Sequence, residues 1–476
     1  MWGCKPMSQD GLIFKNPSVN DMVGTPLIES KQLFNLEYFG PINVPSTMEL
    51  LNSFLPVLVV SFLVSLISVP IVRYIAVRAN IVDKPDGDRK VHTHPVAYLG
   101  GLGVFAGIIG GIVASYLYSG RGLVAEYPSV PFAIIIGMFA IVVTGLMDDV
   151  WGWDPNLKIA GQLIAAAGLA ISDVGTQTAQ GFLMWFFQPE AGQVFFSFIP
   201  ESWFSMFGGP ESEFALRFGP TYSALYYWVG VFLIAAFVIG ACNAANLVDG
   251  LDGLLAGSTS IMGLSFLVIA IIMAIHDASN FYAVDELGIE TWDPLAGTRI
   301  ILSLCLIGST LGFLPYNFNP AVIFLGDAGS MLLGYICAVL ILTMGAEGNT
   351  QLVIAGLIVF AFPIMDTLLA ILRRKLSGLP MSAADNNHIH HMVLRSTGSV
   401  PKSVLYLYLI SVTGGIVGVS LVVMNVLGEI RILFIYSVAL LIFGVVSAVA
   451  LKTAIRHRWS IESTEKTTQG STKKPS

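Results

Sequence analysis

Long apolar stretches recur along almost the whole chain, and they limit it to a fold that crosses a membrane many times. We count 11 of them, several shorter than the roughly 20 residues that an upright helix needs to cross a bilayer. Charged residues make up only 12% of the 476 residues, about half the share found in soluble proteins. The sequence therefore predicts an all-α polytopic membrane protein of about 11 transmembrane helices. The predicted spans are residues 50–76, 97–118, 131–147, 157–171, 222–242, 254–275, 299–316, 330–344, 352–372, 404–424 and 432–451.

Basic residues gather on one side of this predicted bundle and give its orientation. With the N-terminus outside, 17 of the 24 Lys and Arg residues fall after the first and ninth spans, at the start of the fourth, and in the C-terminal tail. Cytoplasmic segments carry this excess of positive charge. We therefore predict a multi-pass protein of the cytoplasmic (inner) membrane with its C-terminus in the cytoplasm. Five polar loops then share the cytoplasmic face, at residues 83–101, 148–158, 243–253, 317–330 and 373–402.

The two ends of the chain and one outer loop differ from the membrane-embedded part, residues 49–451. Residues 1–48 read as an N-terminal extension without the features of a signal peptide. Because the sequence from Met48 resembles a complete N-terminus, we expect residues 1–47 to be dispensable or not made. Residues near 172–221 form an aromatic-rich outer insertion that we expect to lie on the outer leaflet, with lipid binding as the alternative. Residues 452–476 are a basic cytoplasmic tail, yet the net charge of −7 argues against a nucleic-acid partner.

The third polar loop, NAANLVDGLDGLLAG at residues 243–257, lies between two of the most apolar stretches. Its carboxylates are too costly for hydrocarbon, so it must lie at a membrane face or line a wet cavity. If the run is helical, Asn246, Asp249, Gly250 and Gly253 share one face. The glycines would let a phosphate or nucleotide approach the backbone. The alternative is a plain polar turn between two spans.

The second and fourth loops carry carboxylates that suit metal-assisted chemistry. Asp148 and Asp149 are adjacent and repel each other unless a cation is near, which favours a metal site or a general base. Lys158, ten residues on, can reach a phosphate if the chain folds back. Asp327 lies in a Gly-Asp-Ala-Gly turn, and a single carboxylate with open positions suits Mg²⁺. For both loops the alternative is an ordinary helix cap. At Asp327 this cap would precede a span that starts at Ser330.

The first and fifth loops combine basic residues with histidines. A basic cluster at a cytoplasmic membrane face attracts anionic headgroups. The three histidines of the fifth loop resemble a zinc site, but no cysteine accompanies them and their spacing is unlike common zinc motifs. We therefore favour a phosphate-binding cluster. The residues concerned are Arg89, Lys90 and His92 in the first loop, and His388, His390 and His391 in the fifth.

Taken in order, the motifs RKVH…GG, DD…K…Q, NAANLVDGLDG, GDAGS and DNNHIHH resemble the polyprenyl-phosphate N-acetylhexosamine-1-phosphate transferases. The resemblance covers residues 50–451, approximately. HIHH is similar to the branch that uses UDP-N-acetylglucosamine, whereas the muramyl-pentapeptide branch usually has three consecutive histidines. One departure is Ala97, which stands where many members have proline.

The resemblance implies a reaction in which a sugar 1-phosphate passes from a UDP-sugar to undecaprenyl phosphate with release of UMP. N-acetylglucosamine is the favoured sugar, and an epimer or a 6-deoxy relative would use the same loops. The product would be the first lipid-linked intermediate of a cell-surface polysaccharide. The implied cofactor is Mg²⁺, with Mn²⁺ as a substitute. The implied partners are the two substrates and membrane lipids, and the pattern is compatible with a homodimer.

The resemblance also implies residue roles. Asn246 and Asp327 would hold Mg²⁺, and Asp148, supported by Asp149, would deprotonate or orient the acceptor phosphate. Lys158 would contact the donor phosphates. The remaining implied contacts are Asp249, Asp252, Asn317 and Phe324 on the uridine side, His388, His390 and His391 at the diphosphate or sugar, and Arg89, Lys90 and His92 at the acceptor phosphate.

Three alternatives remain open at this point. One is the muramyl-pentapeptide transferase of peptidoglycan synthesis. An intramembrane prenyltransferase would need a second aspartate-rich motif, which the sequence lacks. An ion-coupled transporter places carboxylates near the middle of its spans, whereas the acids here fall at span ends, with Asp366 as the main exception.

Overall fold

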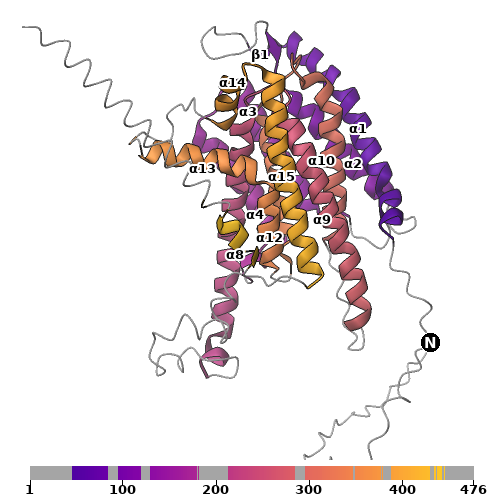
Figure 1. Ribbon diagram of the computed structural model, residues 1–476, viewed down its shortest axis with the longest axis vertical. Helices are drawn as coiled ribbons and strands as arrows, with labels where there is room; N and C mark the ends of the chain where they lie inside the picture. Colours follow the sequence, from indigo (N-terminus) through magenta and orange to yellow (C-terminus); the bar gives the residue numbers. More distant parts are fainter. Residues whose placement is uncertain are drawn as a thin grey trace, which may run out of the picture. The chain divides into compact units, whose positions relative to one another are not determined.

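The computed structural model describes residues 46–83, 95–118, 129–179, 213–284, 295–346, 349–376 and 388–428, with residues 181, 378, 434, 435, 437–441 and 444. The unit formed by residues 45–476 is a bundle of helices, drawn in Figure 1. Its helices are α1 (Thr47–Arg78), α2 (Gly100–Tyr118), α3 (Phe132–Trp151), α4 (Pro155–Ile171), α8 (Glu213–Val248), α9 (Leu254–Val284), α10 (Ala296–Asn317), α11 (Gly326–Thr343), α12 (Thr350–Val359), α13 (Ala361–Leu376), α14 (Ile389–Thr397) and α15 (Val400–Val426). The prediction of an all-α membrane protein is confirmed.

The number of spans differs from the prediction of 11. Within the described residues, eight helices are long and apolar enough to cross a membrane, or nine if α12 and α13 form one broken span. The predicted span at 157–171 is the 17-residue helix α4, which falls below the length of those eight helices and lies at the lower limit for crossing a bilayer. The predicted span at 432–451 lies largely outside the described residues, as do the extension 1–45 and most of the aromatic insertion.

The predicted span at 352–372 is sharply bent rather than straight. Helices α12 and α13 meet near Phe360 at an angle of 79°, and Figure 1 shows α13 lying across the direction of α15. Because the predicted span is apolar on both sides of the break apart from Asp366, hydropathy alone could not reveal it. It turns α13 toward α8, against which it packs.

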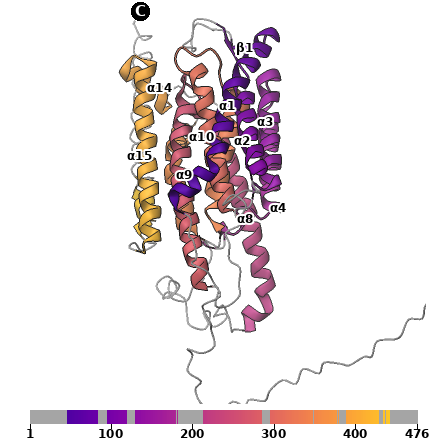
Figure 2. The same ribbon diagram turned by 90° about the vertical axis from the view of Figure 1, so that its right-hand side faces the viewer.

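Two helices form the centre of the bundle. Helix α11 is almost entirely buried, whereas α1 exposes many apolar side chains that suit contact with lipid. Helix α11 packs against α2, α3 and α8, and α10 packs against α1, α2 and α9 (Figure 2). The fully buried Arg299 of α10 donates an Nη1–H bond of 2.8 Å to Thr343 O, in the last turn of α11, where a cation is favoured by the helix dipole.

A short hairpin fixes the connection into α2. Strands β1 (Val82–Asp83) and β2 (Val96–Ala97) pair antiparallel, and Ala97 also forms a parallel bridge with Ile323. The Gly100 N–H then donates to Phe324 O at 2.9 Å. A Cβ on Gly100 would lie 2.5 Å from that oxygen. This glycine is thus required for the close approach of the start of α2 to the segment before α11.

Two local predictions about helix ends are wrong. Helix α8 ends at Val248, so Asn246, Asp249, Gly250 and Gly253 do not share a helical face; Gly253, at φ +78°, belongs to the turn before α9. Conversely, the Gly-Asp-Ala-Gly segment is not a turn before Ser330 but the first turn of α11 itself. Asp327 therefore lies at a helix N-terminus, where the unpaired N–H groups favour a negative charge.

Candidate active site

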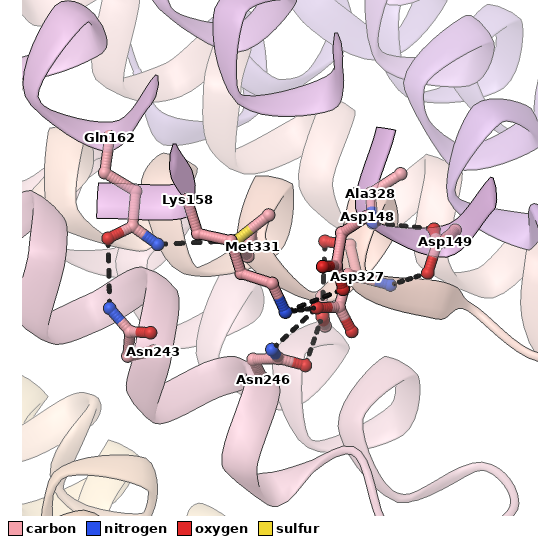
Figure 3. Close-up of polar contacts among 10 residues, drawn as sticks. Asp148, Asp149, Lys158, Gln162, Asn243, Asn246, Asp327, Ala328 and Met331 are labelled. Atoms are coloured by element: carbon pink, nitrogen blue, oxygen red, sulfur yellow. Dashed lines mark hydrogen bonds and ion pairs between the residues drawn. The ribbon is translucent and has the colours of Figure 1, made fainter. Parts of the chain in front are cut away.

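An ion-pair cluster joins three helices at one end of the bundle. The Lys158 Nζ atom of α4 lies 2.6 Å from Asp148 Oδ2 of α3 and 2.6 Å from Asp327 Oδ2 of α11. The three side chains are 22%, 15% and 23% exposed, so the cluster is open to solvent on one side. Figure 3 shows the ammonium group between the two carboxylates. The close approach places two carboxylates around a single cation position.

A tight reversal between α3 and α4 brings Lys158 back to Asp148. Gly152 follows α3 in the left-handed conformation, at φ +65°, which glycine adopts without a steric penalty. Asp154 then caps α4 by accepting the Asn156 N–H at 2.8 Å, and Pro155 occupies the first helical position. Lys158 therefore lies in the first turn of α4, and the chain folds back as its predicted phosphate contact requires.

Asp149 holds the N-terminus of α11. Its two carboxylate oxygens accept the backbone N–H groups of Asp327 at 2.8 Å and Ala328 at 3.1 Å. Gly326 makes this contact possible: its φ is +73°, and a Cβ there would lie 2.6 Å from Asp149 Oδ2. Asp149 thus fixes the backbone from which Asp327 extends, whereas Asp148 faces the cluster.

Asn246 links α8 to the same carboxylate. Its Nδ2 donates to Asp327 Oδ2 at 3.2 Å, and its Oδ1 accepts the Ser330 hydroxyl at 3.1 Å. An amide binds a hard cation through oxygen. To act as the predicted metal ligand, the Asn246 side chain would have to turn its amide by about half a revolution, and Nδ2 would then donate to the Ser330 hydroxyl instead.

A second polar layer lies one helical turn along α4, α8 and α11 (Figure 3). Asn243 Nδ2 donates to Gln162 Oε1 at 3.0 Å and to Ile239 O at 2.8 Å, while Gln162 Nε2 lies 3.3 Å from Met331 Sδ. Gln162 is fully buried, and a buried amide of this kind requires hydrogen-bond partners. The layer ties together the helices that carry Lys158 and Asp327.

The donor set fits a hard divalent cation that is completed by substrate. Across the described residues, no group of three or more His, Cys, Asp or Glu side chains is arranged to hold a metal ion alone. Mg²⁺, however, is usually bound by one or two carboxylates together with waters and substrate phosphates. Asp148 and Asp327, which already converge on a cation in the form of the Lys158 ammonium, match that requirement.

Two predicted uridine-side residues are engaged in loop contacts. Asp252 Oδ2 accepts both Asn319 Nδ2 at 2.8 Å and the Ala321 N–H at 3.0 Å. Asn317 Oδ1 accepts the Gly253 N–H at 3.0 Å, and its Nδ2 donates to Ile323 O at 3.0 Å. They thereby join the loop after α8 to the loop after α10. A direct contact with uridine stays a prediction.

Asp249 and Phe324 lie on the same end of the bundle. Burial, followed by the charges of Asp327, Asp149 and Asp252, raises the pKa of the Asp249 carboxyl to about 8. The half-buried Phe324 ring meets Tyr98 edge to face, with centroids 6.1 Å apart. Sequence patterns gave no reason to select Tyr98, because a single aromatic residue beside a span is common.

The histidine segment forms the start of α14. His388 Nδ1 lies 2.8 Å from Asp366 Oδ2, and its ring stacks on His390 with centroids 5.5 Å apart. His391 contacts His390 with a centroid distance of 4.3 Å. The structure thus joins the three predicted histidines to Asp366, whose only sequence signal was a carboxylate inside an apolar stretch. The predicted acceptor-phosphate residues Arg89, Lys90 and His92 lie outside the described residues.

Comparison with known proteins gives consistent matches. A family model described as "Glycosyl transferase family 4" matches residues 131–345. The "Probable undecaprenyl-phosphate N-acetylglucosaminyl 1-phosphate transferase" of Bacillus subtilis is 35% identical over 77% of this chain and 85% of its own length. The decaprenyl-phosphate N-acetylglucosaminephosphotransferase of Mycobacterium tuberculosis (strain H37Rv) is 32% identical over 71% of this chain and 75% of its length. A phospho-N-acetylmuramoyl-pentapeptide-transferase of Methylacidiphilum infernorum is 32% identical, but over only 40% of this chain and 50% of its length.

Proposed function

This chain belongs to glycosyl transferase family 4, and we propose that it transfers N-acetylglucosamine 1-phosphate from UDP-N-acetylglucosamine to undecaprenyl phosphate. The observation that carries the proposal is the cluster of Asp148, Lys158 and Asp327, which three helices bring together at the bundle end. The relatives that match over most of the chain are named for N-acetylglucosamine 1-phosphate transfer to a polyprenyl phosphate. The relative named for the muramyl-pentapeptide donor matches over a much smaller share of the chain.

Both substrates are anionic, and the cluster supplies opposite charge where they meet. Lys158 can leave its carboxylate partners to contact the donor diphosphate, because a flexible side chain holds its ammonium. Asp148 and Asp327 would hold Mg²⁺ together with donor phosphates, with Asn246 joining after its amide turns. The bound ion would neutralise the diphosphate and stabilise the leaving UMP.

Direct attack by the lipid phosphate is the simplest reaction. An oxygen of undecaprenyl phosphate attacks the β-phosphorus of the donor, the bond between that phosphorus and the bridging oxygen breaks, and UMP leaves with that oxygen. The acceptor is already ionised at neutral pH and needs no base, so Asp148 acts by orienting it. Positioning supplies much of the rate in such a ternary complex, and a covalent phospho-sugar intermediate on Asp148 would gain little.

Exchange of labelled UMP into UDP-N-acetylglucosamine without lipid acceptor separates these two routes. We expect no exchange in carefully delipidated protein, because the donor bond breaks only when the lipid phosphate attacks. Exchange at a rate comparable to turnover would require the covalent route and overturn the role of Asp148.

A panel of UDP-sugars tests the donor. Purified protein with Mg²⁺, undecaprenyl phosphate and each sugar nucleotide in turn should release UMP fastest from UDP-N-acetylglucosamine. Faster release from an epimer would move the assignment to that sugar. Release only from the UDP-muramyl pentapeptide would replace the proposed function with the peptidoglycan reaction.

A further inference from the structure

Asp366 is a buried carboxylate to which the reaction described above assigns no role. It lies on α13, one turn beyond the bend with α12, and is fully buried. An isolated carboxylate is costly to bury unless hydrogen bonds compensate it. Here Oδ1 accepts the Ile389 N–H at 2.6 Å, and Oδ2 lies 2.8 Å from His388 Nδ1. Both oxygens are thus committed to the start of α14.

Helix α14 depends on this carboxylate at its first turn. Its N-cap residue is His388, whose side chain makes no capping hydrogen bond. Asp366 instead caps α14 from another helix by accepting the first helical N–H, and a carboxylate at this position is favoured by the helix dipole. The Asp366 carboxylate therefore places the histidine segment relative to α13, together with the packing of Ile389 against Leu369.

The contact between Asp366 and Nδ1 also fixes one edge of the His388 ring. A histidine that meets a carboxylate through Nδ1 carries a proton there, which leaves Nε2 to act on the opposite side. The His388 ring lies almost parallel to that of His390, with 11° between the planes. Burial is the main reason that the pKa of His390 is lowered to about 3, so this second ring is neutral at neutral pH.

His390 in turn packs on the central polar loop. Its Nε2 lies 2.3 Å from where a Cβ on Gly250 would be, so only a glycine there admits the ring. Gly250 is next to Asp249, on the predicted uridine side. The contacts run from Asp366 to His388 and His390, and from there to the NAANLVDGLDG loop.

We propose that Asp366 is a positioning residue: it sets the Nδ1–H tautomer and the ring orientation of His388, so that His388 Nε2 is presented to the donor diphosphate. The inference rests on the proposed function, because it takes the donor to be a UDP-sugar. Asp366 itself does not touch the substrate. Its effect on transfer passes through His388, so Asp366→Asn, which keeps an acceptor for the Ile389 N–H, should have no further effect once the imidazole is gone.

A double-mutant cycle tests this dependence. The full-length enzyme is compared with Asp366→Asn, His388→Ala and the double variant, measuring kcat and KM for UDP-N-acetylglucosamine. Asparagine keeps an acceptor for the Ile389 N–H but removes the charge that orients the imidazole. We expect Asp366→Asn to lower kcat at least about 30-fold with less than about a threefold change in KM, since a misdirected imidazole loses mainly interactions that strengthen as UMP leaves. The double variant should be no worse than His388→Ala alone.

Two further variants separate positioning from folding. Asp366→Glu restores a carboxylate, and its kcat should be at least about tenfold higher than that of Asp366→Asn. Thr367→Val, at the next position of α13, is the matched control and should leave kcat and KM unchanged. If Asp366→Asn does not fold, the double-mutant cycle is made with Asp366→Glu, His388→Ala and the variant that carries both changes.

Additivity would overturn the proposal. If Asp366→Asn lowers the activity of the His388→Ala enzyme by the same factor as that of wild type, Asp366 acts only as a structural cap. Melting temperatures of the same four proteins without substrate report the contact independently of turnover. If wild-type protein transfers no sugar phosphate while the melting temperatures are non-additive, the proposed function has failed and the Asp366–His388 contact stands. Additive melting temperatures would refute the contact itself.

Discussion

The Lys158 ammonium occupies the position where two carboxylates could hold a divalent cation. Asp148 Oδ2 and Asp327 Oδ2 each lie 2.6 Å from Nζ, so the two carboxylates share one counter-ion that the protein itself supplies. Opposite charges at this distance attract strongly, even where solvent screens them in part. Metal binding and the release of Lys158 are therefore expected to be coupled.

Replacing Lys158 with methionine tests this coupling. Without the ammonium, the two carboxylates lack a counter-ion, so Lys158→Met should bind Mn²⁺ about tenfold more tightly in the absence of donor, as measured by electron paramagnetic resonance. Turnover should fall sharply, because the donor phosphates lose their cationic contact. Lys402→Met, an exposed change on α15, is the control for both measurements. Unchanged or weaker Mn²⁺ binding would contradict competition between Lys158 and the metal.

The Asp249 carboxyl gives a pH-dependent stability with a definite sign. Its pKa is raised to about 8 in the folded protein, against about 4 for an exposed aspartate. The folded state therefore holds more protons than the unfolded state between these values, and stability falls as pH rises through this window. Asp249→Asn cannot ionise, so it removes the cost of a buried charge at high pH. The variant should raise the melting temperature by at least about 2 °C more at pH 8 than at pH 5; an equal shift at both values would refute the raised pKa.

At the scale of elements, the site depends on how α11 begins. Gly326 has φ +73°, and its missing Cβ leaves room for the Asp149 carboxylate that caps the helix. Gly326→Ala should therefore lower the melting temperature and reduce kcat at least about tenfold, since strain and a clash add at one position. Gly240→Ala is the matched control, because a Cβ at this position in α8 meets nothing within 4 Å. A Gly326→Ala enzyme as active and stable as wild type would disprove the role of the cap.

The sequence predicts the helices better than their ends and bends. Eight apolar stretches are recovered as helices of spanning length because hydrophobic length is a strong signal. The bend near Phe360 is invisible to hydropathy, since the predicted span 352–372 is apolar on both sides of it apart from Asp366. The extension of α11 back to Gly326 depends on Asp149, which is 178 residues from Asp327 in the sequence, and no local pattern encodes such a partner.

In the candidate site, too, the sequence predicts which residues matter but not how they are arranged. Motif order predicts that Asp148, Lys158 and Asp327 matter, and the structure places them in one cluster. The pattern alone does not reveal that Asp149 holds a backbone while Asp148 faces the cluster, because adjacent identical residues differ only in direction. Asp366 likewise needed the fold to bring α13 to the histidine segment.

At the scale of the whole molecule, the two ends of α4 give a compact test of orientation. Asn156 and Ser172 are both exposed and flank opposite ends of this helix. In a variant with Cys4 replaced by serine, Asn156→Cys should react with a membrane-impermeant thiol reagent only after cells are opened, because basic residues predict a cytoplasmic face there. Ser172→Cys should react in intact cells. Cys242, Cys305 and Cys337 are buried and give a low background; labelling of Asn156→Cys in intact cells would refute the cytoplasmic site.

The most direct measurement follows the β-phosphorus of the donor. UDP-N-acetylglucosamine labelled with ³²P at the β-phosphate is incubated with purified protein, Mg²⁺ and undecaprenyl phosphate, and the lipid fraction is separated from the nucleotides. Transfer of sugar 1-phosphate predicts that the label enters the lipid in step with the release of unlabelled UMP, and that Asp327→Ala protein, though folded, transfers almost none. Label that remains in UDP while sugar reaches the lipid would mean transfer of the sugar alone and would contradict the proposed reaction.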